Sequence, residues 1–240
     1  MAALALFLNA CKKDNTKIYE SNVAYGKTVA LGSGTAQSFV IKDANGNPQT
    51  IGFTFTEKAL LNLPSTNTMT TIPAPANNGT LVDHMCVDFN AKGHEPAGIY
   101  NVPHFDLHFY MIPEAEQMAI VNGVEMENIP SSEYFPADYA PIPGGDPMMG
   151  KHWADLTSKE FTGHPFDRTF IYGSYNGKFI FHEAMVTLEF FKSKKNFTDL
   201  VKQQTKVQRE GFYPKTYSVT YNAAKKVYTV TLDQLSLKHI

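Results

Sequence analysis

Short stretches of alternating apolar and polar residues, separated by turn residues, run through most of the chain. Four of the turns predict β-hairpins, because Gly, Asn, Asp or Pro stands between two strand-like stretches. The predicted hairpins join residues 38–42 to 50–56, 81–89 to 99–111, 169–173 to 178–191, and 217–221 to 227–232. This pattern predicts a mostly β fold, an antiparallel sandwich or barrel.

Helical patterns are few, and they predict two or three short helices. One is expected over residues 57–61, where Thr56 stands at the N-cap position. A second is expected over residues 114–119, because Pro113 suits the first turn of a helix. The third is expected over residues 193–204, which are polar apart from Phe197, Leu200 and Val201.

Residues 124–166 form a long stretch rich in Pro, Gly and Met, and they predict a long loop. Loops of this length in a compact domain are usually functional or cover a site. The stretch also carries large apolar side chains, namely Tyr134, Phe135, Tyr139, Met148 and Met149. They would either close over an apolar pocket or pack on a neighbouring subunit, and the sequence leaves both interpretations open.

Composition narrows the class of protein. The 240 residues include 21 Lys and Arg against 23 Asp and Glu, a formal charge of −2. A nearly neutral chain gives no electrostatic reason to expect nucleic-acid binding. Aromatic residues make up 12% and charged residues 18%, which favours β structure. We expect a single β-rich domain over residues 26–240.

The first eleven residues resemble a bacterial lipoprotein signal. An apolar run ends in Leu8-Asn9-Ala10-Cys11, although the usual basic start is missing. This pattern predicts removal of residues 1–10, acylation of Cys11, and a polar tether over residues 11–25. Acyl chains would then hold the protein on a lipid bilayer of the cell envelope, facing the periplasm or the cell surface. The alternative is an ordinary apolar N-terminus with a chance Cys. The other cysteine, Cys86, is expected to be a buried free thiol.

The densest group of candidate ligands is Pro103-His104-Phe105-Asp106-Leu107-His108-Phe109-Tyr110. On a strand, alternate side chains share a face, so His104, Asp106 and His108 point one way. The residues between them, Phe105 and Leu107 among them, would face the core. Because positions two apart are separated by about 6.6–6.8 Å, all three polar residues cannot reach one ion without a bend. Residues from other strands are therefore needed to complete a metal site.

We predict a metal site formed by His104, His108, His152 and Glu183. His94 is a reserve ligand, and Asp106 is expected to orient a ligating histidine. Imidazole and carboxylate ligands suit a transition metal, and zinc is the metal that we expect. The remaining histidines His84, His164 and His239 are interpreted as ordinary hydrogen-bonded residues.

The sequence leaves two classes of function open. Three protein ligands with an open fourth position would allow metal-dependent catalysis, with the long loop as a lid. Closed coordination, or no metal, would instead indicate a non-catalytic binding or assembly protein. No phosphate-binding loop, GxSxG motif or dinucleotide fingerprint occurs in the sequence.

Several strings together resemble one uncharacterised family of bacterial extracytoplasmic proteins. They are Gly93-His94-Glu95-Pro96, the Pro103–Tyr110 string, Gly150-Lys151-His152-Trp153, residues 172–178, and Phe181-His182-Glu183-Ala184-Met185. The family's described member is a homodecameric Thermus protein under extracytoplasmic sigma and anti-sigma control. The resemblance implies a β-rich, exported, oligomeric protein and brings no activity. Ala184 departs from the family pattern, which usually has Pro there.

Overall fold

A computed structural model describes residues 22–240. Cys11, the predicted signal and nearly all of the predicted tether therefore lie outside the described residues. The first described strand begins at Val23, three residues before the domain boundary that the sequence predicts. Within residues 22–240, no helix has the length and apolar character needed to cross a membrane.

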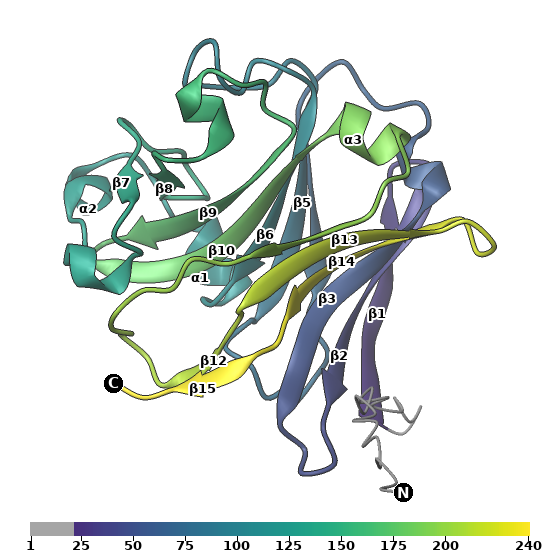
Figure 1. Cartoon of the computed structure of the whole chain (residues 1–240), viewed down its shortest axis with the longest axis horizontal. Helices are drawn as coiled ribbons and strands as arrows, with labels where there is room; N and C mark the ends of the chain where they lie inside the picture. Colours follow the sequence, from purple (N-terminus) through teal and green to yellow (C-terminus); the bar gives the residue numbers. More distant parts are fainter. Residues whose placement is uncertain (1–21) are drawn as a thin grey trace, which may run out of the picture.

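The fold is built from two antiparallel sheets packed as a sandwich, together with a small two-stranded ribbon (Figure 1). The six-stranded sheet has the order β1-β2-β3-β14-β13-β11. Its strands are β1 (Val23–Leu31), β2 (Gly34–Lys42), β3 (Pro48–Thr56), β14 (Val227–Asp233), β13 (Thr216–Asn222) and β11 (Phe197–Leu200). The ribbon pairs β12 (Gly211–Tyr213) with β15 (Ser236–Lys238).

The seven-stranded sheet has the order β4-β5-β6-β10-β9-β8-β7. Its strands are β4 (Thr68–Pro73), β5 (His84–Asn90), β6 (His104–Tyr110), β10 (Lys178–Thr187), β9 (Arg168–Tyr175), β8 (Lys151–Asp155) and β7 (Tyr139–Pro141). All four predicted hairpins are confirmed as the antiparallel pairs β2–β3, β5–β6, β9–β10 and β13–β14. The sandwich, rather than the closed barrel, is the form that the fold takes.

Short helices lie at the ends of the strands. They are α1 (Glu114–Met118), α2 (Val124–Glu127) and α3 (Leu188–Lys192), with 3-10 segments η2 (Glu57–Leu60), η3 (Ser132–Tyr134) and η4 (Lys159–Thr162). The predictions at residues 57–61 and 114–119 correspond to η2 and α1, although the Thr56 side chain makes no capping hydrogen bond. Helix α3 is not predicted from the sequence, which extends the strand to residue 191; its first turn is capped by the Thr187 hydroxyl, which accepts from the Phe190 amide.

The predicted helix over residues 193–204 is wrong. Residues 197–200 form strand β11, which pairs with β13 along the edge of the six-stranded sheet. The strand buries Phe197 and leaves Leu200 81% exposed, so these side chains do not share one helical face. A short polar segment is only marginally stable as a helix by itself. Pairing with β13 gives its backbone N–H and C=O groups hydrogen-bond partners, and so the strand forms instead.

The main core lies between the two sheets. Phe53 of β3 packs on Phe109 of β6 with ring centroids 6.1 Å apart, and Phe55 packs on Phe191 at 5.4 Å. A second apolar cluster covers the outer face of the seven-stranded sheet. It joins strand residues such as Ile171 and Met185 to residues of the connections, among them Tyr100, Ile120, Met126 and Phe166. The central strands β5 and β6 are consequently buried on both faces.

The predicted long loop over residues 124–166 contributes side chains both to the main core and to the outer cluster. It contains α2, η3, β7, β8 and η4, and two of these elements extend the seven-stranded sheet at its edge. Trp153 of β8 stacks on Phe135 with ring centroids 3.8 Å apart, and both rings belong to the main core. Met126 and Phe166 belong to the outer cluster. His152 alternates with Trp153 on β8 and therefore lies on the outer face.

Candidate metal centre

The alternation predicted for β6 is present in the structure. Residues 104–110 form one strand, and all seven are buried. Phe105, Leu107 and Phe109 belong to the core between the sheets. His104, Asp106 and His108 occupy the alternate positions, and so they lie on the outer face beneath the connections.

Strand pairing places further polar residues beside this row. Glu183 of β10 is opposite His108, and Asp88 of β5 is opposite Asp106. Residues directly opposite each other in an antiparallel pair lie on the same face of a sheet. A buried polar surface therefore extends across three neighbouring strands.

The first candidate ligand group contains three of the four residues that the sequence predicts. His108 Nε2 lies 3.5 Å from Glu183 Oε2, and His152 Nε2 lies 3.6 Å from the same oxygen. One ligand atom from each residue lies within 4.8 Å of the others. His108 and Glu183 are fully buried, whereas the His152 side chain is 15% exposed.

The position of His152 depends on a glycine. His152 of β8 is paired with Gly173 of β9, and β9 separates β8 from Glu183 on β10. A Cβ atom at Gly173 would lie 2.0 Å from the Phe181 ring. Because Gly173 has no side chain, the Phe181 ring occupies this space and packs 5.3 Å from the His152 ring. The Phe181 ring therefore packs against the His152 ring and holds it in place.

Asp88 contacts the other side of the His108 ring, with His108 Nδ1 2.9 Å from Asp88 Oδ2. A carboxylate behind a ligating histidine fixes the orientation of the ring and makes it a better donor to a metal. Asp88 is not among the predicted site residues, because it lies in the mostly apolar strand predicted over residues 81–89. The signal that could have found it is a carboxylate at an otherwise buried strand position.

Burial and neighbouring charges shift the pKa values of this group. Burial raises the pKa of Glu183 to about 8, although nearby His108 opposes the shift. Burial alone would lower the pKa of His108, but Glu183 and Asp88 raise it to about 9. Burial and repulsion by His108 lower the pKa of His152 to about 3. Neutral His152 is the form that can donate a lone pair to a metal.

The second candidate group contains His94, His104 and Asp106. His104 Nε2 lies 3.1 Å from Asp106 Oδ1, and His94 Nε2 lies 3.3 Å from Asp106 Oδ2. His104 and His108, which are predicted from the sequence to share one site, fall into different groups in the structure, four residues apart on β6. Asp106 contacts the rings of His94 and His104, whereas the residue behind His108 is Asp88.

Several buried atoms of the two groups lack a hydrogen bond of acceptable geometry within the described residues. They are His104 Nε2, Asp106 Oδ1, both ring nitrogens of His108, both oxygens of Asp88, and Glu183 Oε2. Buried polar atoms are rarely left without a partner, because desolvation without compensation is costly. A cation in the first group would satisfy His108 Nε2 and Glu183 Oε2, and a cation in the second would satisfy His104 Nε2 and Asp106 Oδ1.

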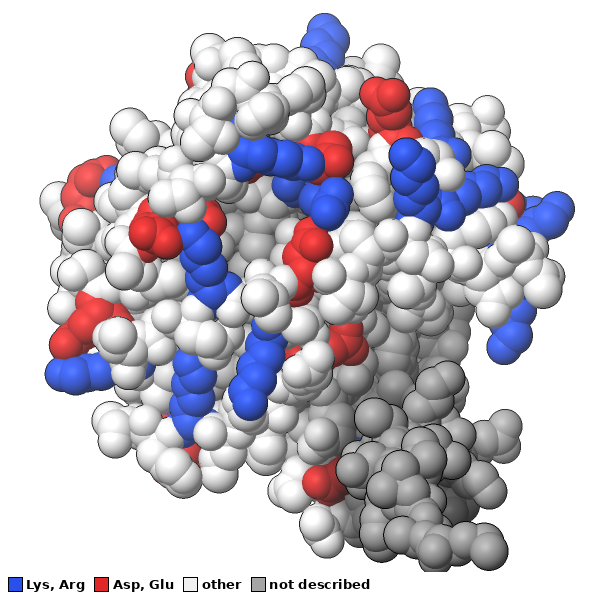
Figure 2. Space-filling model, in the orientation of Figure 1, with Lys and Arg blue, Asp and Glu red and all other residues white. Residues whose placement is uncertain are grey.

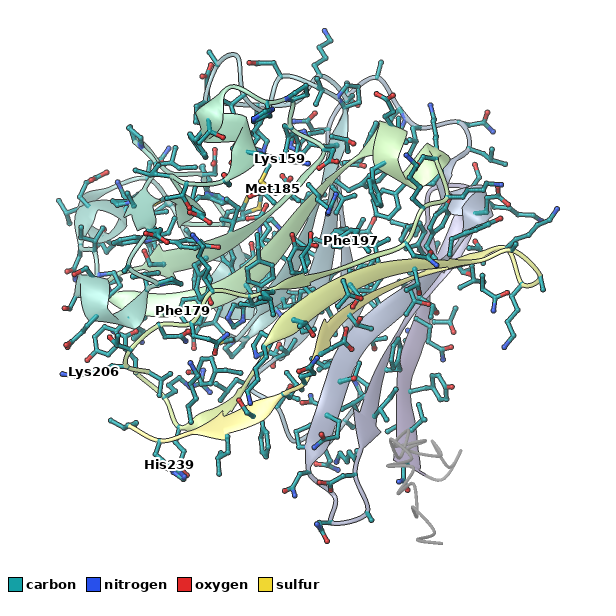
Figure 3. The ribbon with its side chains drawn as sticks, in the orientation of Figure 1. Lys159, Phe179, Met185, Phe197, Lys206 and His239 are labelled. Carbon is teal, nitrogen blue, oxygen red and sulfur yellow. The ribbon has the colours of Figure 1, made fainter. Side chains whose placement is uncertain are left out.

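Other histidines differ from the candidate ligands. His84 is buried, and its ring nitrogens lie 3.0 Å from Asp83 and 2.8 Å from Gln117, as expected for an ordinary hydrogen-bonded residue. His239 pairs with Glu210 at the surface. In Figure 3 the labelled His239 lies at the edge of the molecule near the C-terminus, well apart from the labelled Met185, which is opposite Asp106 in the β6–β10 pair.

Surface carboxylates also differ from the buried ones. Figure 2 shows Lys and Arg interspersed with Asp and Glu over the face in view. Lys202, for example, lies 2.7 Å from Asp138 and 2.8 Å from Asp155, and Arg168 lies 2.7 Å from Asp199. These acidic groups have cationic partners from Lys and Arg, whereas Glu183 and Asp106 face imidazoles.

Cys86 is a buried free thiol, as the sequence predicts. Burial, followed by the nearby Asp88 carboxylate, raises its pKa well above the ordinary value. It is paired with His108 across β5 and β6, and its sulfur lies 3.9 Å from the Thr71 hydroxyl. The thiol therefore remains protonated, which disfavours it as a metal ligand.

Comparison with known proteins links part of the chain to an uncharacterised family. Residues 43–89 match the model of an uncharacterised family described as "TTHB210-like: Hypothetical protein TTHB210". The matched segment covers β3 to β5 and includes Asp88, but it ends before the histidine motif of β6. It supports the resemblance to an uncharacterised family, and it brings no activity. Searches of curated proteins and of solved structures found no match.

Proposed function

We propose that this protein binds a transition metal ion through His108, His152 and Glu183, and that the ion is zinc. The observation that carries the proposal is the convergence of His152 on two buried ligand atoms, His108 Nε2 and Glu183 Oε2, that lack hydrogen-bond partners within the described residues. Two imidazoles and one carboxylate form a donor set of the kind that zinc accepts, with a fourth position left for water or another ligand.

The distances support a tetrahedral site. Ligand atoms about 2.0–2.1 Å from a tetrahedral zinc ion lie about 3.3–3.4 Å from one another. The separations of Glu183 Oε2 from His108 Nε2 and His152 Nε2 are 3.5 and 3.6 Å, close to that value. A small inward movement of the side chains would complete the coordination.

An ion bound by His108, His152 and Glu183 would serve either catalysis or non-catalytic binding. With an open fourth position it would polarise a small substrate or activate a water molecule, which is the enzymatic alternative. A specific observation favours non-catalytic binding. The His108 and Glu183 side chains are fully buried, and the His152 side chain is only 15% exposed, so a substrate has little access to the group.

The first experiment is elemental analysis of the purified full-length chain after exposure to zinc. Parent protein is expected to retain zinc, and His152→Ala and Glu183→Gln are expected to lose the ion bound at this group. His239→Ala is the matched control, because that exposed histidine pairs only with Glu210 among the described residues. Absence of stoichiometric metal in the parent would refute the proposal, as would full retention in both variants.

A second experiment separates enzyme from binding protein. Cobalt(II) replaces zinc with the same donors and reports ligand exchange in its visible spectrum. Addition of azide is expected to change the spectrum if the fourth position is open to small molecules. An unchanged spectrum in cobalt-loaded protein would indicate closed coordination and support the non-catalytic alternative.

We also propose that the protein is an exported lipoprotein anchored through Cys11, and that it assembles as a homo-oligomer. The support comes from the Leu8-Asn9-Ala10-Cys11 pattern and from the family resemblance. Mass spectrometry of full-length protein from membranes tests the anchor, because an unmodified Cys11 with residues 1–10 attached would refute it. Analytical ultracentrifugation tests the assembly, and a monomer at micromolar concentration would refute it.

A further inference from the structure

The second polar group has the same composition as the first, two histidines and one carboxylate. His104 and Asp106 come from β6, whereas His94 comes from the connection between β5 and β6. Asp106 lies between the two rings, with one oxygen 3.1 Å from His104 Nε2 and the other 3.3 Å from His94 Nε2. The His104 side chain is fully buried, the Asp106 side chain is 4% exposed, and the His94 side chain is 37% exposed.

Both histidines are held by backbone carbonyl groups. His104 Nδ1 donates to the Val102 carbonyl oxygen at 2.7 Å, and His94 Nδ1 donates to the Glu95 carbonyl oxygen at 2.6 Å. A carbonyl oxygen only accepts, so each Nδ1 carries the hydrogen. In the neutral ring, Nε2 then presents a lone pair toward Asp106. Metal-ligating histidines are commonly oriented by a hydrogen bond of this kind from the other nitrogen.

The Asp106 carboxylate is also held in place by a hydrogen bond, which leaves one of its oxygens for a metal ion. Asp106 Oδ2 accepts a hydrogen bond from the Asn90 amide at 2.6 Å, whereas Oδ1 has no hydrogen bond within the described residues. Oδ1 and the His104 Nε2 lone pair are both acceptors, yet they lie 3.1 Å apart. Two buried acceptors at this distance need a cation or a proton between them.

Aromatic rings pack against both histidines of the group. Tyr100 lies 5.8 Å from the His94 ring, and Phe166 packs edge-on against His104 at 5.5 Å. Gly93 precedes His94 with φ of +73°, and an added Cβ would lie 2.0 Å from the Tyr100 carbonyl oxygen. The turn that brings His94 over the sheet therefore requires glycine at this position.

We propose that His94, His104 and Asp106 bind a second transition metal ion, separate from the one at His108, His152 and Glu183. The inference rests on the proposed function, since the two groups lie side by side on one buried face. Asp106 contacts His94 and His104, whereas His108 contacts Asp88 and Glu183, so Asp106 and His108 serve different ions. Three buried carboxylates on this face, Asp88, Asp106 and Glu183, offset much of the charge of two divalent ions.

The rival occupant of the second group is a proton. Two imidazolium rings flanking the Asp106 carboxylate would also satisfy these contacts. Metal stoichiometry separates the two cases, because a protonated triad binds no ion.

The experiment is equilibrium dialysis of the full-length protein and its variants against zinc, followed by measurement of zinc per chain. The parent and the His239→Ala control are expected to hold two ions. His94→Ala is expected to hold one, because His94 lies in a partly exposed connection and its loss leaves the strands intact. His152→Ala is also expected to hold one ion, and the variant that combines His94→Ala with His152→Ala is expected to hold none. Asp106→Asn, which preserves the shape of the side chain, provides a second test and is expected to hold one ion.

Four results would overturn the second site. If the parent holds one ion that His94→Ala retains and His152→Ala loses, the second site fails and the proposed function stands. If the parent holds one ion that either single variant removes, the two groups form a single shared site. If the parent holds two ions and His94→Ala and Asp106→Asn both retain two, the second ion lies elsewhere. If the parent holds none, both proposals fail.

Discussion

The two faces of strand β6 are equally buried but chemically opposite. The inner face carries Phe105, Leu107 and Phe109 against the other sheet, and the outer face carries His104, Asp106 and His108 under the connections. Burial alone therefore does not decide which residue types a strand position accepts. A face covered by another sheet selects apolar side chains, whereas a face covered by loops can hold polar groups that find partners.

The energetic roles of the two faces differ accordingly. Each large apolar side chain on the inner face contributes roughly 1.5–3 kcal/mol through burial. The outer face gains nothing comparable from its carboxylates and imidazoles, because desolvation offsets their mutual attraction. We therefore expect the inner face to stabilise the fold and the outer face to bind ions.

The largest effect is expected from shortening a side chain on the inner face. Leu107→Ala removes a fully buried side chain between the sheets and is expected to lower the free energy of unfolding by about 2–5 kcal/mol. Chemical denaturation measures the loss, and metal content is expected to stay at the parent value. A variant that keeps its stability but loses metal would contradict the division between the faces.

Removal of metal is expected to have the next largest effect. An ion that binds only the folded protein adds about 2.7 kcal/mol when its free concentration is 100 times Kd. The full-length protein is therefore expected to unfold at lower temperature in excess chelator, and added zinc is expected to restore the parent value. Identical unfolding temperatures with and without chelator would argue against an ion at the outer face.

A smaller effect, on zinc affinity, is expected from changing Asp88, the carboxylate that contacts the ligand His108. Asp88→Asn keeps the size of the side chain but removes the charge that faces His108 Nδ1. We expect zinc affinity at this group to fall about 10–100-fold, the range for loss of such a partner. Competition with a chromophoric chelator measures the change. An unaltered affinity would show that Asp88 does not orient the ring.

The smallest effect concerns a histidine on the inner face. His182 lies among Phe170, Tyr172 and Phe179, and burial lowers its pKa to about 3. Above pH 6.5 the ring is neutral in both the folded and the unfolded chain. Below pH 6.5 only the unfolded chain takes up the proton, so the free energy of unfolding falls as pH decreases toward 3.

His182→Leu is expected to remove the part of the pH dependence that comes from this ring. That part is a decrease of about 1 kcal/mol in the free energy of unfolding between pH 6.5 and pH 5.5. Denaturation of the parent and the variant at both pH values, in excess chelator, measures it. Equal pH dependence in the two proteins would show that the ring becomes protonated in the folded state.

Much of the fold could be predicted from the sequence because its signals are local. Turn residues and alternating patterns identified the four hairpins, and the alternation from His104 to His108 predicted which face of β6 is polar. The error at residues 193–204 has a physical cause. Pairing with β13 comes from a distant segment, and it outweighs the weak helical tendency of those residues.

The candidate site could be predicted only in part, because its geometry depends on pairing between distant strands. His152 and Glu183 were found from their residue types, and the structure brings them to His108. The division into two groups depends on the distance along β6 and on the turn that carries His94. Asp88 was missed because its contact with His108 follows from the β5–β6 register, which an apolar run does not reveal.

The most direct test of the central claim is a crystal structure of the zinc-loaded full-length protein, with anomalous diffraction recorded on both sides of the zinc absorption edge. We predict an anomalous peak bonded to Nε2 of His108, Nε2 of His152 and a carboxylate oxygen of Glu183, at about 2.0–2.2 Å from each. Ordered water in place of that peak, with these side chains bonded only to one another, would contradict the account.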